Sequence, residues 1–324
     1  MSAPVPFEIR VPDADLADLQ DRLMRTRWPD TNVDNDDWSY GANTNYLKQL
    51  AEFWQTCDWR AQENYLNGGF GCGAHHFTIK LPPGSGPGSD LTMHFVQAKA
   101  SGGGGVPLLL LHGWPGSFFE FHSIFKPLVD AGFDVIAPSL PGYGFSEAPH
   151  ERHFGPIHMA EAMDLLMRTL GYPWYVAQGG DWGSMITMSL AKLSSLGKRT
   201  ACRAAHCNMV SAGPPPKEVM ANLPPLSDWD KQGLARAAEY QQNDAGYSKI
   251  QGTKPQSIGT ALNDSPAGLL GWIVEKLRTW SDCDGDPENC FSKMVRTTVS
   301  SAYKLALGAL ITMLITPILL SMIV

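Results

Sequence analysis

The sequence predicts an α/β fold, in which a mostly parallel sheet carries a helical N-terminal lobe and a helical cap. Short apolar runs, such as residues 108–111, alternate with segments long enough for a crossover helix, as in βαβ units. Apolar residues recur at helical spacing near the N-terminus, and a proline-rich stretch after Val210 leads into a segment without strand character. We therefore expect a helical lobe (1–72), a core (73–210), a helical cap (211–280), a linker (281–304) and an apolar tail (305–324).

The N-terminal lobe is predicted from three apolar stripes. A turn at Val11, Pro12 and Asp13 precedes leucines at positions 16, 19 and 23, which indicates a short amphipathic helix. Similar stripes cover residues 46–54 and 59–70, before Gly71 interrupts the pattern. The core then begins with an expected strand hairpin and continues with parallel strands; these strands are expected at 76–81, 91–100, 108–111, 134–139, 174–178 and 201–210.

Composition excludes several classes of protein. The 324 residues are 44% hydrophobic with 10 Trp, so the chain has a sizeable core and is neither disordered nor fibrous. The net charge of −7, without a cluster of Lys and Arg, argues against a nucleic-acid partner. Charged residues near the start disfavour a secretion signal and indicate a chain that faces the cytoplasm. The six cysteines form no C-x-x-C pair, so we expect reduced thiols, no metal site and no cofactor.

The main chemical signal is the segment 179–183, with the sequence Gly-Gly-Asp-Trp-Gly. It follows an apolar strand and precedes a predicted helix, as does the G-x-S-x-G elbow that exposes the nucleophile of many hydrolases. Here the elbow residue is Asp181, and a carboxylate suits displacement at an sp³ carbon with formation of an alkyl ester. Epoxides and alkyl halides are substrates of this kind. Asp181 could instead be an ordinary helix N-cap.

A second motif favours the catalytic interpretation. His112, Gly113, Trp114 and Pro115 end an apolar strand, where the second amide of an oxyanion hole is expected. The backbone amides of Trp114 and Trp182 would then bind the oxygen of Asp181 that becomes negative when water attacks the ester.

With these motifs the sequence resembles the epoxide hydrolases of the α/β-hydrolase fold, and more closely the microsomal-type branch with an N-terminal extension. The resemblance runs from about residue 6 to about 280 and includes LLLHGWPGSFFEF, PSLPGYGFSEAP, GGDWGSMI and GYSKIQGTKPQ. The G-x-G-x-S element typical of the family is intact, with Gly142, Gly144 and Ser146. The resemblance implies an epoxide as substrate, together with water. It also implies that Tyr247, in the lid, donates a hydrogen bond to the epoxide oxygen; a packed cap aromatic is the simpler alternative. A second family tyrosine has no match that we can place.

The resemblance weakens after residue 280. Family members continue with the last sheet strands, an acidic residue and a histidine that activates water, whereas here only His206 follows Asp181. Because His206 lies on a predicted strand, we expect it to be a core or structural residue and the last strands and the water-activating base to be missing. Residues 282–291 do not form a calcium loop, because Pro287 and Lys293 replace the Gly and Glu that such a loop needs.

The tail has three interpretations. Residues 305–324 are uncharged and just long enough to span a bilayer, and Arg296 and Lys304 before them fit a cytoplasmic flank. They could instead form a buried element broken at Pro317, or result from a wrongly predicted gene end.

The functional hypothesis is therefore hydrolysis of a hydrophobic epoxide, in detoxification or in secondary metabolism. One alternative is a catalytically impaired protein that binds or scavenges epoxides, because the water-activating histidine is not found. Another is a haloalkane dehalogenase, in which Asp-Trp-Gly also occurs. The N-terminal extension and the segment around Tyr247 argue against the dehalogenase.

Overall fold

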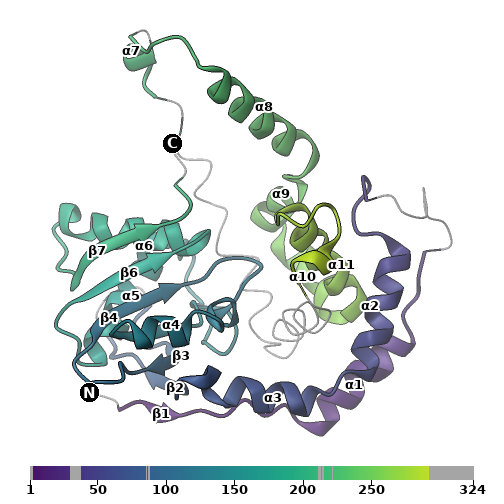
Figure 1. Cartoon of the computed structure of the whole chain (residues 1–324), viewed down its shortest axis with the longest axis horizontal. Coiled ribbons are helices and arrows are strands. Elements are labelled where there is room, and N and C mark those ends of the chain that lie inside the picture. Colours follow the sequence, from purple (N-terminus) through teal and green to yellow (C-terminus); the bar gives the residue numbers. More distant parts are fainter. Residues whose placement is uncertain are drawn as a thin grey trace.

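The computed structural model describes residues 3–29, 38–84, 86, 88–210, 213, 215–220 and 222–291. In this part of the chain, a seven-stranded mixed sheet has the order β1-β2-β3-β5-β4-β6-β7 (Figure 1). The predicted α/β fold is confirmed, with a parallel half and an antiparallel half. The strands are β1 Val5–Pro6, β2 His75–Lys80, β3 Thr92–Ala98, β4 Val106–Leu111, β5 Phe133–Pro138, β6 Tyr175–Gly179 and β7 Cys202–Cys207.

Strand pairing follows the sequence pattern closely. The expected hairpin is present, since β2 and β3 pair antiparallel from His75 opposite Gln97 to Lys80 opposite Thr92. Strands β5, β4, β6 and β7 run parallel to one another, as crossover connections require. β3 joins the two halves by pairing antiparallel to β5.

Helices cover both faces of the sheet, and the alternation of side chains along each strand explains why. Leu109 and Ile136 pack in a cluster with α5 Pro156–Thr169 and α6 Trp182–Leu193. Leu108 and Val135, each one position earlier, pack on the other side with α4 Phe125–Asp130 and the short helix η2 Phe118–Phe121. Central strands therefore need apolar residues at every position, which is why they read as continuous apolar runs.

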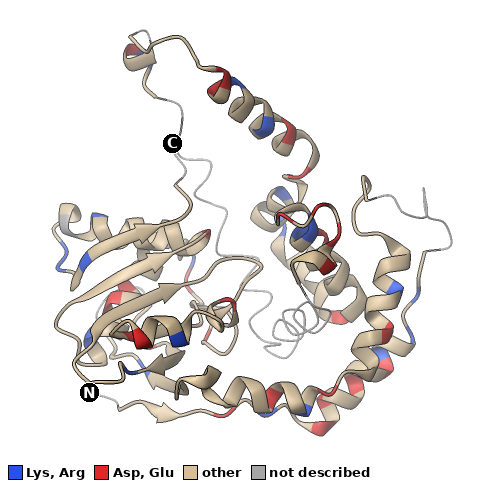
Figure 2. Cartoon of the chain, in the orientation of Figure 1, with Lys and Arg blue, Asp and Glu red and all other residues tan. Residues whose placement is uncertain are grey.

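The N-terminal lobe contains α1 Asp13–Met24, α2 Thr44–Thr56, α3 Trp59–Asn67 and the turn η1 Gly69–Gly71. The three expected helices are confirmed, and the lobe additionally supplies β1 to the sheet. Leucines of α1 and Trp54 of α2 share a hydrophobic cluster with Leu270 and Val274 of α11 Pro266–Thr279. The lobe is thus packed against the cap. Acidic and basic residues are interspersed along α1 and α3 (Figure 2).

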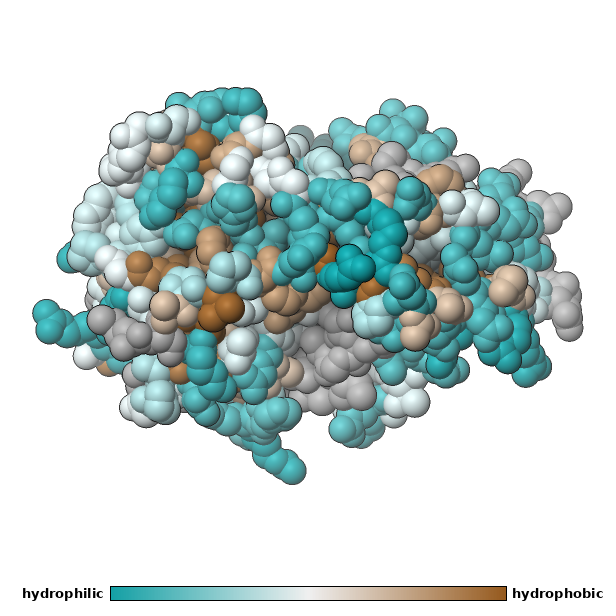
Figure 3. Space-filling view, turned by 90° about the horizontal axis from the view of Figure 1, so that it is seen from below, coloured by the Kyte–Doolittle hydropathy of each residue, from teal (hydrophilic) through white to brown (hydrophobic). Residues whose placement is uncertain are grey.

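The cap is helical, as expected. It contains α7 Lys217–Met220, α8 Asp228–Asn243, α9 Gly246–Thr253, α10 Pro255–Asp264 and α11, and the short helix η4 Pro287–Asn289 follows. Helix α8 has no buried residue and projects away from the sheet, with Trp229 74% exposed (Figure 1). On the face seen in Figure 3, hydrophobic residues form small patches separated by hydrophilic ones.

The expectation that His206 is a core residue is wrong. His206 lies on β7, opposite Gln178 of β6, and its side chain is exposed. β7 is the last strand of the sheet among the described residues, and four of its six residues are exposed. The predicted strand at 201–210 is therefore present, from Cys202 to Cys207, but its apolar appearance does not reflect burial.

The candidate membrane tail, 305–324, lies outside the described residues, as does most of the expected linker. None of the helices that the structure describes is both long and apolar enough to cross a membrane. All six cysteines are unpaired thiols. Short helix η3 Ser194–Leu196 completes the described elements.

Candidate active site

Asp181 stands on a tight turn between β6 and α6. Its φ of 49° lies in the left-handed region, which is uncommon for a residue with a side chain and typical of a strained functional turn. Glycine is required on both sides of it. A Cβ on Gly179 would lie 2.0 Å from the carbonyl oxygen of Gly183, and a Cβ on Gly183 would lie 1.9 Å from that of Leu111. The two glycines of the motif therefore serve close backbone packing, and the elbow interpretation is supported over a simple N-cap.

Two backbone amides bind the Asp181 carboxylate. The amide of Trp114 donates to Asp181 Oδ1 at 2.8 Å, and the amide of Trp182 also donates to this carboxylate. Burial raises the pKa of Asp181 above its ordinary value, while both amide hydrogen bonds lower it. The two amides named in the sequence analysis, those of Trp114 and Trp182, thus both bond this one carboxylate, as an oxyanion hole would require.

The loop after β4 is held in place by His112. Its ring is fully buried; Nε2 accepts a hydrogen bond from the amide of Leu140 at 3.1 Å, and Nδ1 lies 3.1 Å from the carbonyl oxygen of Gly113. Burial lowers the pKa of His112 to about 4, so the ring is neutral at physiological pH. The peptide bond between Trp114 and Pro115 is cis. His112 thus positions the loop and is not available as a base.

The G-x-G-x-S element forms the turn after β5. Gly142 and Gly144 have φ values of 80° and 51°, and a Cβ on Gly144 would lie 2.6 Å from Ser139 Oγ. Ser146 is buried; its hydroxyl donates to the carbonyl oxygen of Ser139 at 2.7 Å and accepts from the amide of His94 at 2.9 Å. The element fastens the turn to β3. Together with His112 and Asp181, it lies where β5, β4 and β6 end, the edge at which open α/β sheets bind ligands.

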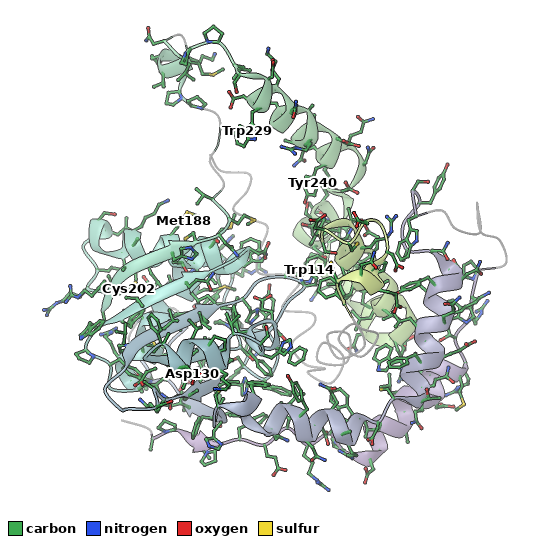
Figure 4. All side chains as sticks on the ribbon, in the orientation of Figure 1. Trp114, Asp130, Met188, Cys202, Trp229 and Tyr240 are labelled. Carbon is green, nitrogen blue, oxygen red and sulfur yellow. The ribbon has the colours of Figure 1, made fainter. Side chains whose placement is uncertain are left out.

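Tyr247 of α9 contacts Trp114 directly. Its ring stacks on the Trp114 ring with centroids 5.0 Å apart and planes 9° apart, and the Trp280 ring lies 5.0 Å from it. The Lys276 ammonium lies 4.7 Å from the Tyr247 centroid, a cation–π distance. The hydroxyls of Tyr240 and Tyr247 are 3.1 Å apart. Figure 4 shows Trp114 beside the cap helices and Tyr240 at the end of α8.

Desolvation and the neighbouring Tyr240 raise the pKa of Tyr247, so its phenol is protonated at neutral pH. Tyr247 also lines a recess of about 880 Å³ between the lobe and the cap, whose wall includes Trp38, Tyr40 and Lys276. Asp181 is not among its lining residues. No group of His, Cys, Asp and Glu able to hold a metal ion occurs in the described ranges.

Three neighbours of the site were missed by the sequence reasoning: Glu120, Tyr240 and Lys276. Glu120 stands within the motif that contains Trp114, but nothing in its spacing distinguishes it from a surface residue. Tyr240 precedes Tyr247 by seven residues, but the two lie on different helices, α8 and α9, so helical spacing gives no signal for their contact. Lys276 is buried, which sequence patterns do not predict for a lysine.

Two family models match the chain. The model described as epoxide hydrolase N terminus matches residues 4–121, and the model described as alpha/beta hydrolase fold matches residues 106–261. Epoxide hydrolase 1 of Sus scrofa is 33% identical over an alignment of 335 positions, which covers 92% of this chain and 68% of that protein. A relative from Stigmatella aurantiaca is 38% identical over 89% of this chain, but the match covers 63% of that protein's length.

Solved structures agree with these matches. The epoxide hydrolase of Aspergillus niger superposes with a TM-score of 0.81 at 29% identity, covering 97% of this chain and 78% of that one. The juvenile hormone epoxide hydrolase of the silkworm Bombyx mori gives a TM-score of 0.80 at 28% identity, with 97% and 76% covered. The predicted family resemblance and the α/β-hydrolase fold are thus confirmed.

Proposed function

Because this chain belongs to the epoxide hydrolase family, we propose that it opens a hydrophobic epoxide through an ester on Asp181 and releases a vicinal diol. The observation that carries the proposal is the Asp181 elbow with its two amides. A carboxylate at a strained strand-to-helix turn, bonded at 2.8 Å by the Trp114 amide, is arranged to form and then hydrolyse an ester.

In the first step, the free oxygen of Asp181 attacks one ring carbon of the epoxide, and the bond from that carbon to the ring oxygen breaks. The ring oxygen leaves as a developing alkoxide and takes a proton from Tyr247. The phenol suits this role because its raised pKa keeps it protonated until the alkoxide forms. The stacking of Tyr247 on Trp114 ties the proton donor to the loop that also binds Asp181.

In the second step, water attacks the carbonyl carbon of the Asp181 ester. The carbonyl oxygen becomes negative, and the amides of Trp114 and Trp182 stabilise this charge in a largely buried position. Collapse of the intermediate breaks the bond to the alkyl oxygen and releases the diol.

An apolar substrate is favoured by the aromatic groups near the site. Trp114, Tyr247 and Trp280 form a contiguous cluster of rings, with Trp114 and Trp280 5.8 Å apart. Such rings bind apolar and aryl groups well. We therefore propose aryl-substituted epoxides as the first substrates to test, in a detoxifying or biosynthetic role.

The test is to incubate the protein with an aryl-substituted epoxide and to record intact protein mass and diol yield. We expect an adduct of one substrate mass that is absent in Asp181→Asn, and slower adduct formation in Tyr247→Phe. A single stable adduct without diol would show scavenging instead of turnover. No adduct and no diol, or halide release from a chloroalkane, would contradict the proposal.

A separate proposal concerns the position of the protein in the cell. We propose that the chain faces the cytoplasm and is anchored by residues 305–324, since twenty uncharged residues follow Lys304. Flotation of the full chain with liposomes, and its loss when the chain ends at residue 304, is the expected result. Recovery of both forms in the unbound fraction would contradict it.

A further inference from the structure

A second carboxyl group lies beside the nucleophile, on the oxyanion-hole loop itself. Glu120 belongs to η2, and its carboxylate accepts a hydrogen bond from the backbone amide of Gly113, the residue before Trp114. Asp181 touches the same residue, because a Cβ on Gly113 would lie 2.3 Å from Asp181 Oδ1. Both carboxyl groups therefore contact Gly113.

Glycine at two loop positions leaves the room that these carboxyl groups occupy. A Cβ on Gly116 would lie 2.2 Å from Glu120 Oε2, just as a Cβ on Gly113 would collide with Asp181. The loop backbone thus lies against Glu120 at one glycine and against Asp181 at the other. Ser117 caps η2 by accepting a hydrogen bond from the amide of Phe119, which fixes the turn that carries Glu120.

Glu120 is surrounded by protein atoms but is still in contact with solvent. Its side chain is exposed to solvent, yet desolvation by the surrounding protein and the negative charge of Asp181 raise its pKa to about 8. Asp181 is the charged group that acts on it most. A carboxyl group that titrates near neutral pH and that water can reach is typical of general acid–base groups.

We propose that Glu120 is a catalytic carboxyl of the ester-hydrolysis step, which binds the attacking water beside Asp181 and accepts its proton. This inference rests on the proposed function. As the water oxygen bonds to the ester carbonyl carbon of Asp181, one water proton passes to Glu120, and the carbonyl electron pair moves to the oxygen held by the two amides. When the bond to the alkyl oxygen breaks, the leaving alkoxide takes that proton from Glu120 and becomes the diol. The proton left on Asp181 returns through solvent to the Tyr247 phenolate.

The decisive variant is Glu120→Gln, which keeps the shape and can still accept the Gly113 hydrogen bond. The exposed Glu151→Gln is the matched control. Each protein is mixed with a limiting amount of aryl-substituted epoxide in ¹⁸O-labelled water, and formation and decay of the Asp181 adduct are followed by mass spectrometry. We expect Glu120→Gln to form the adduct at the parent rate but to lose it at least about 100-fold more slowly, the contribution of a general base. Glu151→Gln should behave as the parent.

The pH dependence separates proton transfer from a purely structural role. A base is active when ionised, so adduct decay in the parent should speed up as pH rises through the pKa of Glu120. In the adduct this pKa lies below about 8, because the ester removes the Asp181 charge, but burial still keeps it above the ordinary value. The inflection should vanish in Glu120→Gln, and added formate should restore decay in Glu120→Ala. Equal decay rates and equal pH profiles in parent and Glu120→Gln would overturn the proposal, and so would a parent adduct that never decays. No adduct in any variant would instead be failure of the proposed function.

Discussion

Two helices of similar size, α6 and α8, show how differently the sequence is constrained in the core and in the cap. Helix α6 begins next to Asp181 and buries six residues, whereas the sixteen residues of α8 bury none. Trp229 of α8 lies far from the sheet, while Met188 of α6 lies on it (Figure 4). At α6 close packing restricts the residue types, since even a Cβ on Gly183 would lie 1.9 Å from the Leu111 carbonyl oxygen. Along α8 they need only favour a helix.

The sharpest contrast comes from one glycine in each helix. In Gly183→Ala the new Cβ meets the Leu111 carbonyl oxygen, a backbone atom that cannot move away, so we expect loss of more than about 4 kcal/mol or no folded protein. In Gly233→Ala the Cβ meets nothing within 4 Å, and we expect a gain of about 0.5–1 kcal/mol in helix stability. Urea denaturation and far-ultraviolet circular dichroism measure both. A stable, active Gly183→Ala protein would contradict the close packing of the elbow.

A second large effect is expected from acidification, which acts on buried histidines of the core. His94 Nε2 lies 2.9 Å from His76 Nδ1, His94 Nδ1 lies 2.9 Å from Ser139 Oγ, and His76 Nε2 lies 3.0 Å from the Leu66 carbonyl oxygen. These contacts can all be hydrogen bonds when the rings of His76 and His94 are both neutral, each with one nitrogen donating and the other accepting. Desolvation lowers the pKa of His76 and His94, and that of His112 to about 4.

The pKa of each of these histidines is lower in the folded protein than in the unfolded chain, where it is about 6.5. Above about pH 6.5 the rings are neutral in both states and do not change the free energy of unfolding. Below about pH 6.5 the unfolded chain binds protons that the folded protein does not, so the free energy of unfolding decreases. His112 alone contributes a loss of about 3 kcal/mol by pH 4. Glu120, whose pKa is raised, acts in the opposite sense below pH 8. Urea midpoints measured from pH 7.5 to 4.5 should therefore fall in the Glu120→Gln variant, which lacks this opposing effect, and should fall less in the parent. A flat profile would show that the buried rings are already accommodated in charged form.

A smaller effect distinguishes the N-terminal serines of two helices of the cap, of which α11 is packed against the lobe and α8 is exposed. Ser265 caps α11 by accepting from the Gly268 amide at 2.9 Å, and Ser227 caps α8 by accepting from the Asp230 amide at 3.2 Å. Loss of a serine cap costs about 1 kcal/mol. We expect Ser265→Ala to lower global stability by this amount, since α11 is the cap helix that packs against the N-terminal lobe. Ser227→Ala should leave the urea midpoint unchanged and raise only the rate of proteolysis within α8. Equal urea midpoints for Ser265→Ala and Ser227→Ala would contradict the expectation that only the α11 cap contributes to global stability.

The smallest effect is expected for an exposed residue of α8, Trp229. Trp229 is 74% exposed, so Trp229→Ser should change the free energy of unfolding by less than about 0.5 kcal/mol. Chemical denaturation gives the value directly, with the buried Trp54→Ser as a strongly destabilised reference. A large loss for Trp229→Ser would mean that α8 packs against something in solution.

Much of the fold and of the catalytic elbow was predictable, for a local reason. Gly179, Asp181 and Gly183 act within five residues, and the strands around them read directly as apolar runs. What could not be predicted depends on distant parts of the chain. The stacking of Tyr247 on Trp114 joins residues 133 positions apart, and the burial of Lys276 depends on ring partners supplied by the cap. His206 was misjudged because an apolar strand indicates burial only where another element covers it.

Trp114 takes part in two contacts that belong to different parts of the molecule. Its amide donates a hydrogen bond to the Asp181 carboxylate, while its indole lies flat against the ring of Tyr247 in the cap. A ligand that separates Tyr247 from the indole would change the surroundings of the residue whose amide holds Asp181. The same indole is a fluorophore whose emission depends on what covers it. Displacement of the cap would therefore change the emission of Trp114, one of the ten tryptophans of the chain.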